Sequence, residues 1–116
     1  MIDILLVDKP MSRQELKQIA EQRFGDMVKA VVDIKKEIMV IGGDLHADEE
    51  AVLLDQGSKQ ENLWGINIYH ELAMPDMIEY DSMINIRPKQ NNLSRNVEDK
   101  KIRERIAAVV TKLIAD

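Results

Sequence analysis

Hydrophobic positions recur along the chain with two periods, and each change of period marks an expected element. Residues 2–7 form a short run rich in Ile, Leu and Val before a Pro-containing turn, which predicts a strand. Apolar residues then recur at spacings of three and four, which predicts a helix over residues 12–24 whose apolar face holds Leu16, Ile19, Ala20 and Phe24. Ser12 and Glu15 have the spacing of a capping box at the start of this helix.

The next two segments have the composition of strands. In residues 27–34, apolar side chains alternate with Lys29 and Asp33, which predicts a strand with one face in water. Residues 38–41 are apolar throughout, which predicts a strand in the interior of the sheet with both faces buried. A Gly-Gly pair follows and is expected to end or bend this strand.

Residues 44–56 fit two interpretations. As a helix, the segment would be capped by Asp44 or Asp48 and ended by Gly57. As a strand, its alternate positions would form one polar row, made of Asp44, His46, Asp48 and Glu50. We favour the helix because Ala, Glu and Leu dominate the segment.

The second half of the chain contains two further alternating segments and one helical segment. Residues 63–69 and 78–86 alternate between apolar and polar positions, which predicts two strands of one hairpin. The stretch between the second strand and the last helix has no apolar periodicity and indicates a loop. Helical spacing returns near the C-terminus and predicts a helix over residues 97–114, with Asn96 as its cap.

The composition agrees with this sequence of elements. A length of 116 residues with 45% apolar and 32% charged positions suits one domain with its own core. We expect a single α+β domain over residues 1–116, with a mostly antiparallel sheet of about five strands and two or three helices packed on one face. The chain has no Cys, which excludes disulfides, thiolate-bound zinc and iron–sulfur ligation.

The net charge of the chain indicates which classes of partner it can bind. The formal charge is −5, from 16 basic and 21 acidic residues, and non-specific nucleic-acid binding requires massed Lys and Arg. We therefore do not expect the chain to bind nucleic acids broadly. The first residues carry acids where a signal peptide carries bases, and their apolar run is too short for such a peptide. A cytoplasmic protein without a membrane segment is expected.

Three segments carry a family resemblance. They read GGDLHADEE at residues 42–50, GSKQENLWGINIY at residues 57–69 and DSMINIRP at residues 81–88. Together they resemble a family of short prokaryotic proteins catalogued only as a domain of unknown function, and the resemblance covers nearly all of the chain. It supports the single-domain interpretation and implies no activity. The family pattern has a Gly near Asn91 and a basic residue near Leu93, so this chain departs from it at both positions.

The first candidate site precedes the last helix. Free N–H groups and the positive end of the helix dipole meet there, and four side chains could converge on a phosphate or carboxylate: Arg87, Lys89, Ser94 and Arg95. The alternative is that Asn96 and Glu98 satisfy the helix end themselves and the basic residues pair with surface acids.

The second candidate site lies in residues 44–50. His46 with Asp48 could transfer protons, and the polar row of the strand interpretation could offer nitrogen and oxygen ligands to Mg²⁺, Mn²⁺ or Zn²⁺. A metal would need a further acid such as Glu61 or Asp81. A solvated helix start is the alternative, and the sequence identifies no cofactor.

The third candidate group is Asn67, Asn85 and Arg87, on the polar side of the expected hairpin. These side chains could line a ligand cleft, or they could form the wet face of the sheet. Two functions follow. In the first, the three groups converge in one pocket that binds an anionic small molecule, with or without catalysis. In the second, the chain is a non-catalytic interaction or regulatory module that forms a homodimer or binds a protein partner.

Overall fold

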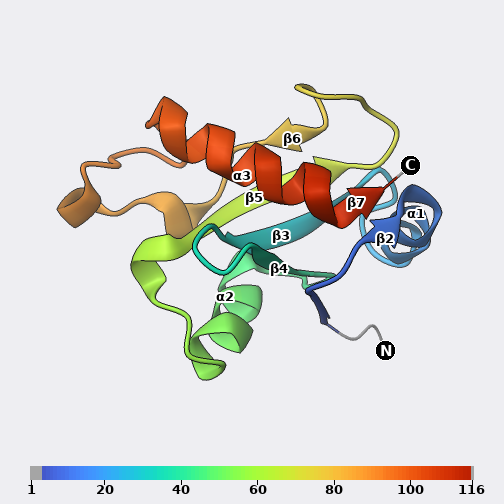
Figure 1. Ribbon diagram of the computed structural model, residues 1–116, viewed down its shortest axis with the longest axis horizontal. Helices are drawn as coiled ribbons and strands as arrows, with labels where there is room; N and C mark the ends of the chain where they lie inside the picture. The colour runs from blue at the N-terminus through green and yellow to red at the C-terminus, as the bar shows by residue number, and fades with distance from the viewer. Residues whose placement is uncertain (1–3, 116) are drawn as a thin grey trace.

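The segments rich in β-branched residues assemble into one antiparallel sheet (Figure 1). The computed structural model describes residues 4–115, so the first two residues of the predicted strand at 2–7 lie outside the described residues. The spatial order of the strands is β1 (Leu5–Val7), β4 (Ile38–Ile41), β3 (Met27–Asp33), β5 (Leu63–Tyr69) and β6 (Ile78–Glu79). Every neighbouring pair is antiparallel, which confirms the predicted sheet.

Three α-helices and one small parallel strand pair complete the fold. The helices are α1 (Arg13–Glu21), α2 (His46–Asp55) and α3 (Lys100–Leu113). The pair consists of β2 (Met11–Ser12) and β7 (Ile114–Ala115), which directly precede α1 and follow α3. The α+β class is confirmed. Within residues 4–115, no helix is both long enough and apolar enough to cross a membrane.

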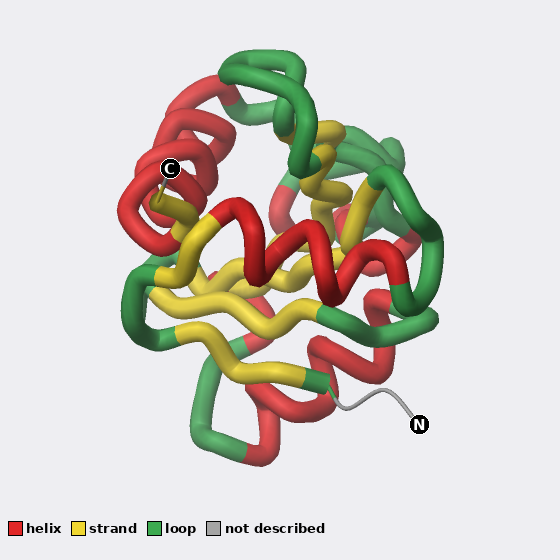
Figure 2. Tube along the Cα trace, turned by 90° about the vertical axis from the view of Figure 1, so that its right-hand side faces the viewer, coloured by secondary structure: helices red, strands yellow, loops and turns green. Residues whose placement is uncertain are grey.

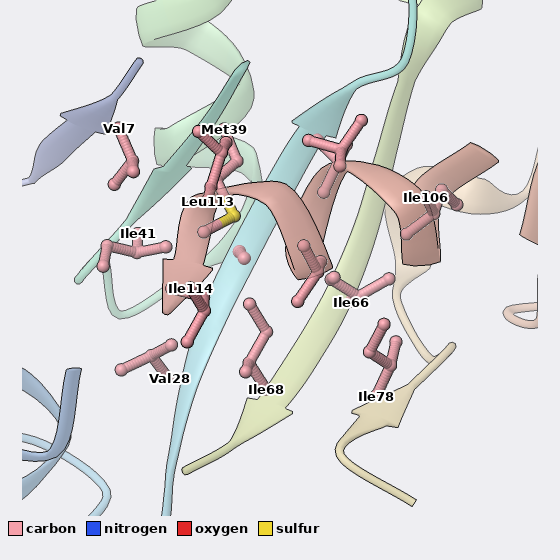
Figure 3. Close-up of a cluster of buried hydrophobic side chains, with 14 of the residues drawn as sticks. Val7, Val28, Met39, Ile41, Ile66, Ile68, Ile78, Ile106, Leu113 and Ile114 are labelled. Carbon is pink, nitrogen blue, oxygen red and sulfur yellow. The ribbon is translucent and has the colours of Figure 1, made fainter. Parts of the chain in front are cut away.

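The helices cover both faces of the sheet (Figure 2), which corrects the expectation that they pack on one face. The main core lies between the sheet and the helices α1 and α3, as the close-up in Figure 3 shows for Ile66, Ile106 and Leu113. A smaller core on the opposite face joins α2 to the sheet, through Leu53, Val31, Val40 and Leu63. The sequence pattern did not reveal the second layer, because Lys29 and Asp33 lie on the face of β3 that α2 partly covers and predicted a face in water.

Strand β3 therefore does not have the wet face that its alternation predicted. It lies between β4 and β5, and α2 covers the face that holds Val31 and Asp33. Asp33 is buried at the end of this strand, where its carboxylate accepts hydrogen bonds from the N–H groups of Lys35 and Lys36 and from the hydroxyl of Ser58. The carboxylate of Asp33 therefore stabilises the turn that follows β3.

The first helix begins as predicted and ends earlier. Ser12 is the N-cap of α1, and it forms the capping box with Glu15. The helix ends at Glu21, and Gly25, with φ of +87°, donates its N–H to the carbonyl oxygen of Ala20 at 2.7 Å. The predicted helix is therefore about one turn too long at its C-terminal end, because the chain leaves the helix after Glu21 and before Gly25.

The helix interpretation of residues 44–56 is confirmed by α2, but its predicted caps are wrong. Leu45 occupies the N-cap position, and no side chain caps the helix. The carboxylate of Asp44 instead pairs with Arg23, and Asp48 lies exposed within the first turn. The start of α2 thus keeps uncapped N–H groups and the positive end of its dipole.

The predicted strand over residues 78–86 is also wrong. Only Ile78 and Glu79 pair with β5, and the chain then turns into the short 3₁₀ helix η2 (Met83–Asn85). The buried side chain of Asn85 takes the place of a strand neighbour for Gly65 in β5. Its Oδ1 accepts from the Gly65 N–H at 2.8 Å, and its Nδ2 donates to the Gly65 carbonyl oxygen at 2.9 Å.

The last helix begins later than predicted. Asp99 rather than Asn96 is the N-cap of α3, and its Oδ1 accepts from the N–H of Lys101 at 2.8 Å. Two further 3₁₀ helices are η1 (Gln60–Asn62), which precedes β5, and η3 (Pro88–Gln90), which lies in the loop between η2 and α3. At the end of η3, Asn91 adopts a left-handed conformation with φ of +59°, which Asn tolerates better than most residues.

Candidate functional site

A pocket of about 180 Å³ lies beside the start of α2, and we call it the α2 pocket. Its polar lining residues come from β3, the start of α2, η2 and the loop before α3, and they are Lys29, His46, Ser82 and Arg95. Its apolar walls are Leu45, Ala47, Met83 and Ile84. The α2 pocket therefore gathers three basic side chains, and no acidic side chain of the described part of the chain lines it.

His46 is held in the α2 pocket by one of its two ring nitrogens. Its Nε2 lies 2.7 Å from the carbonyl oxygen of Ile66 in β5. Because a carbonyl oxygen only accepts hydrogen bonds, Nε2 carries the proton and donates it. The other nitrogen, Nδ1, then keeps its lone pair and makes no hydrogen bond to any residue between 4 and 115.

The surroundings keep this imidazole neutral. Burial is the largest cause that lowers the pKa of His46 from its ordinary value, and the charges of Lys29 and Arg95 lower the pKa further. The hydrogen bond to Ile66 and the charge of Asp81 act in the opposite direction. At neutral pH, the ring of His46 is therefore an uncharged hydrogen-bond acceptor on the side of the α2 pocket.

Two cations complete the electrostatics of the α2 pocket. Lys29 forms no ion pair with the described residues, and its ammonium lies 5.6 Å from the centroid of the Phe24 ring. Arg95 donates from Nε to Asp81 at a distance of 2.5 Å, which leaves its two terminal nitrogens available. With the uncapped end of α2, the pocket combines a helix dipole and two side-chain cations, the features that bind anions in proteins.

Arg87 and Lys89 lie elsewhere, in a separate groove of about 490 Å³ beside η1 and η3. The guanidinium of Arg87 stacks on Trp64, 4.1 Å from the ring centroid, and donates to the carbonyl oxygens of Gln60 and Leu63. Burial lowers the pKa of Arg87 from its ordinary value. Two of the five donors of Arg87 thus hold the chain at the start of β5, and its buried Nε has no partner among the described residues.

The predicted anion site at the last helix is occupied by the protein's own carboxylate. Oε2 of Glu98 accepts from the N–H groups of Leu93 and Ser94, both at 2.9 Å, and from the Ser94 hydroxyl at 2.8 Å. These hydrogen bonds, led by that of the hydroxyl, hold the pKa of Glu98 below its ordinary value. Ser94 therefore binds Glu98, while Asp99 caps the start of α3.

The two candidate amides also have partners within the fold. Asn85 is fully buried, and its Nδ2 donates to the carbonyl oxygens of Gly65 and Arg95. Asn67 donates from Nδ2 to Glu79 at 2.8 Å, while its buried Oδ1 has no partner. Neither amide lines the α2 pocket. Of the residues predicted to converge, the structure brings only His46 and Arg95 together there.

The acidic residues around His46 do not form a second centre. No hydrogen bond joins His46 to Asp48, and no group of three His, Asp or Glu side chains within residues 4–115 could hold a metal ion. Glu49 is fully buried in α2 and accepts from the N–H of Gly43 at 2.9 Å. Burial is the largest cause that raises the pKa of Glu49, to about 9, so this side chain is protonated at neutral pH.

Sequence reasoning missed Lys29 and the uncapped start of α2. The signal for the helix start was present, because the residue directly before His46 is Leu45, which cannot accept a hydrogen bond through its side chain. Lys29 gave no such signal. It lies in an alternating strand, where a Lys on a solvated face is the ordinary expectation.

The family comparison agrees with the resemblance seen in the sequence. A family model described as "Protein of unknown function (DUF5674)" matches residues 5–113 of the chain. No curated protein and no solved structure matches it. An assignment of function therefore has to come from the geometry of the site.

Proposed function

Since the chain belongs to the DUF5674 family, whose function is unknown, we propose from the geometry that it binds a small anionic molecule in the α2 pocket. The observation that supports this proposal is the meeting of an uncapped helix start with Lys29 and Arg95 in one hollow without acidic lining. No side chain caps the first turn of α2, and the N–H of Asp48 donates to the carbonyl oxygen of Leu45 at 3.2 Å. An anion would supply an acceptor to the N–H groups of His46 and Ala47 before it.

Charge complementarity decides between an anionic and a neutral ligand. A charge-assisted hydrogen bond contributes about 1.5–3 kcal/mol, roughly twice as much as a neutral one. The α2 pocket offers such donors from Lys29 and from the terminal nitrogens of Arg95. A neutral ligand would leave Lys29 without a counterion and would not use the charge at the terminal nitrogens of Arg95, whose Nε pairs with Asp81. An anion therefore gains most from the pocket.

The test is a titration of the ¹⁵N-labelled protein with sodium phosphate at constant ionic strength, followed by two-dimensional NMR. We expect saturable shifts of the amide signals of His46 and Ala47. The variants Lys29→Met and Arg95→Gln should each weaken binding about tenfold or more, equivalent to about 1.4 kcal/mol. The matched control is Lys89→Met, which removes the same charge from the other groove and should leave binding unchanged.

Two results would contradict the proposal. The first is the absence of saturable shifts at the start of α2 with phosphate and with small carboxylates. The second is an equal loss of affinity in Lys89→Met and Lys29→Met, because this would show a diffuse effect of net charge in place of a site.

The alternative function is a homodimeric interaction module, and the observation that favours it is the outer edge of β1, which pairs with no strand of the described residues. This edge is three residues long, and few backbone hydrogen bonds can form along it. We therefore favour the α2 pocket. Sedimentation at high protein concentration distinguishes the two, since a dimer without response to anions would support the module.

A further inference from the structure

We propose that the anion bound in the α2 pocket carries a hydroxyl, and that this hydroxyl donates a hydrogen bond to Nδ1 of His46. The inference rests on the proposed function and adds the class of ligand. It distinguishes oxyanions that carry a hydrogen-bond donor from those that have none. Hydrogen phosphate and 2-hydroxycarboxylates belong to the first group, and sulfate and simple carboxylates belong to the second.

The imidazole of His46 has a fixed orientation. Nε2 donates to Ile66 O at 2.7 Å, and this oxygen belongs to an interior strand that holds its position. His46 is 7% exposed, so the ring has little room to rotate away from this bond. The polar atom that His46 can offer to a ligand is therefore Nδ1.

Nδ1 of His46 lacks a hydrogen-bond partner among the described residues. The fold provides no hydrogen bond to this atom within residues 4–115. The buried polar atoms without a partner do not include it, so Nδ1 is accessible to solvent, and His46 lines the α2 pocket. A ligand that donates to Nδ1 satisfies an acceptor that the protein leaves open.

The ring of His46 is neutral because of the burial and the charges around it. The groups that face His46 are Lys29 from β3, Arg95 from the loop before α3, and Asp81 from the segment after β6. Burial, followed by the two cations, outweighs Asp81 and the hydrogen bond to Ile66, so the pKa of His46 is lowered. At neutral pH the pocket thus holds two cationic donors and one neutral acceptor, and an oxyanion with a hydroxyl complements all three.

The apolar walls indicate which hydroxyl-bearing anion fits best. Leu45 and Met83 are 59% and 65% exposed, which is unusual for large apolar side chains beside a charged site. A short alkyl group on the ligand would cover part of this surface. A 2-hydroxycarboxylate with a short alkyl chain offers the carboxylate, the hydroxyl and the apolar group together, within a volume of about 180 Å³.

The experiment compares matched anions at pH 7.5 by NMR titration. The inorganic pair is hydrogen phosphate against sulfate, and the organic pair is 2-hydroxybutanoate against butanoate. We expect the hydroxyl-bearing member to bind about tenfold more tightly in at least one pair. A preference in the inorganic pair alone identifies a phosphate ligand, and a preference in the organic pair identifies a hydroxy acid.

Protonation of His46 provides a second readout on the unchanged protein. Once the ring is protonated, Nδ1 becomes a donor, so the preference for the hydroxyl should fall as the pH decreases. The ring signals of His46 in the same NMR spectra show when this happens. Hydrogen phosphate takes up a proton in the same pH range, so the organic pair, whose carboxylates titrate at about pH 4, is used for this readout. In that pair the expected curve of preference against pH follows the titration of His46.

Variants of His46 complete the design. His46→Leu removes the acceptor, and the ratio of affinities within each pair should fall to about one. His46→Gln keeps one donor for Ile66 O and one acceptor, and it should retain part of the preference. If His46→Leu fails to fold, the pH dependence of the unchanged protein remains the deciding measurement.

The outcomes separate the two proposals. Equal binding within both pairs, with shifts at the start of α2, overturns the hydroxyl inference and leaves anion binding in place. A preference that does not change as His46 becomes protonated also overturns the inference. If none of the four anions binds, both proposals are wrong.

Discussion

At the scale of single residues, several polar side chains replace backbone partners. The amide of Asn85 hydrogen-bonds both backbone groups of Gly65, as a neighbouring strand would do. The segment that holds Asn85 can approach Gly65 because position 65 has no side chain. A Cβ there would lie 2.5 Å from Cβ of Ser82, which directly precedes η2. A substitution of Gly65 would therefore displace both η2 and Asn85.

Another residue-scale feature is the buried carboxyl of Glu49, which makes stability depend on pH. Its pKa is raised from 4.5 to about 9 in the folded protein. Between these values, the unfolded chain binds fewer protons than the native protein, so stability falls as pH rises. The contribution is fully present below about pH 4.5 and is lost progressively up to about pH 9, by about 1.4 kcal/mol per pH unit at most.

We predict that Glu49→Gln removes this dependence. Urea unfolding from pH 5 to pH 8 should show that the variant gains stability relative to the original protein as pH rises, since Gln has no proton to lose. The control is Asp48→Asn, an exposed carboxylate in the same turn, for which the difference should stay nearly constant. A constant difference for Glu49→Gln would show that Glu49 ionises normally.

Residue roles were predictable where partners are close in sequence. Ser12 and Glu15 lie one turn apart, so their spacing alone identified the capping box. Asn85 and Gly65 are joined through tertiary structure, and nothing in the sequence marks Asn85 as the partner of Gly65. The same reason explains why Asn85 and Arg87 looked like ligand-binding residues, whereas both hold the edge of β5.

At the scale of elements, the three helix starts differ. Ser12 caps α1 and Asp99 caps α3, while α2 has no side-chain cap. A missing cap costs about 1 kcal/mol of stability. The start of α2 is thus the least satisfied of the three, and it is the one that lies against Lys29 and Arg95 in the α2 pocket.

We predict that Leu45→Asp stabilises the protein and weakens anion binding. The new carboxylate would cap α2 and place a negative charge where the ligand binds, and the exposed Leu45 contributes little core packing. Thermal unfolding should show a gain of about 1 kcal/mol, and the phosphate titration a loss of about tenfold. Asp99→Ala is the matched control, with lower stability and unchanged affinity.

The opposite pattern would contradict this account of α2. If Leu45→Asp lowers stability, the N–H groups at the start of the helix are already satisfied. If it leaves the affinity for phosphate unchanged, the anion does not bind at this helix start. Leu45→Asn separates the two effects, because it caps the helix without adding a charge.

Helices and strands were predictable where a regular apolar pattern corresponds to residues that are buried in the fold, and less predictable elsewhere. The apolar stripe of α3 and the buried strand β5 follow from their patterns, and both were found. The alternation over residues 78–86 failed as a predictor because most of its apolar positions never join the sheet. Their backbone groups are satisfied by turns, by Ser82 and by Arg95, which an alternating pattern does not reveal.

At the scale of the whole molecule, two cores of unequal size lie on opposite faces of one sheet. The smaller core holds α2 through Leu53, and the larger one holds α3 through residues that include Ile106. The α2 pocket depends on the smaller core, because that core fixes the helix whose start forms the pocket. Stability and ligand binding should therefore respond differently to the two cores.

We predict that Leu53→Ala and Ile106→Ala both destabilise the protein, by about 2–5 kcal/mol each. Leu53→Ala should also weaken anion binding under conditions where the protein is folded, because it loosens α2. Ile106→Ala should not. Chemical unfolding and the phosphate titration measure the two effects, and equal affinities in the two variants would show that the pocket does not depend on the smaller core.

The meeting of the polar side chains in the α2 pocket is a property of the whole molecule, and the sequence could not predict it. Lys29, His46 and Arg95 come from three distant segments, and the arrangement of β3, α2 and the loop before α3 brings them together. The net charge of −5 indicates an acidic surface, and it gave no hint of a local basic pocket.

The parallel pairing of Met11 with Ile114 has a consequence for the order of folding. These two residues lie far apart in the sequence, so their contact closes a loop that contains every element from α1 to α3. Closing so long a loop early is entropically costly, whereas β3 and β4 meet across a tight turn. A chain emerging from the ribosome can form that hairpin at once, but its β2 segment must wait until Ile114 and Ala115 have been synthesised.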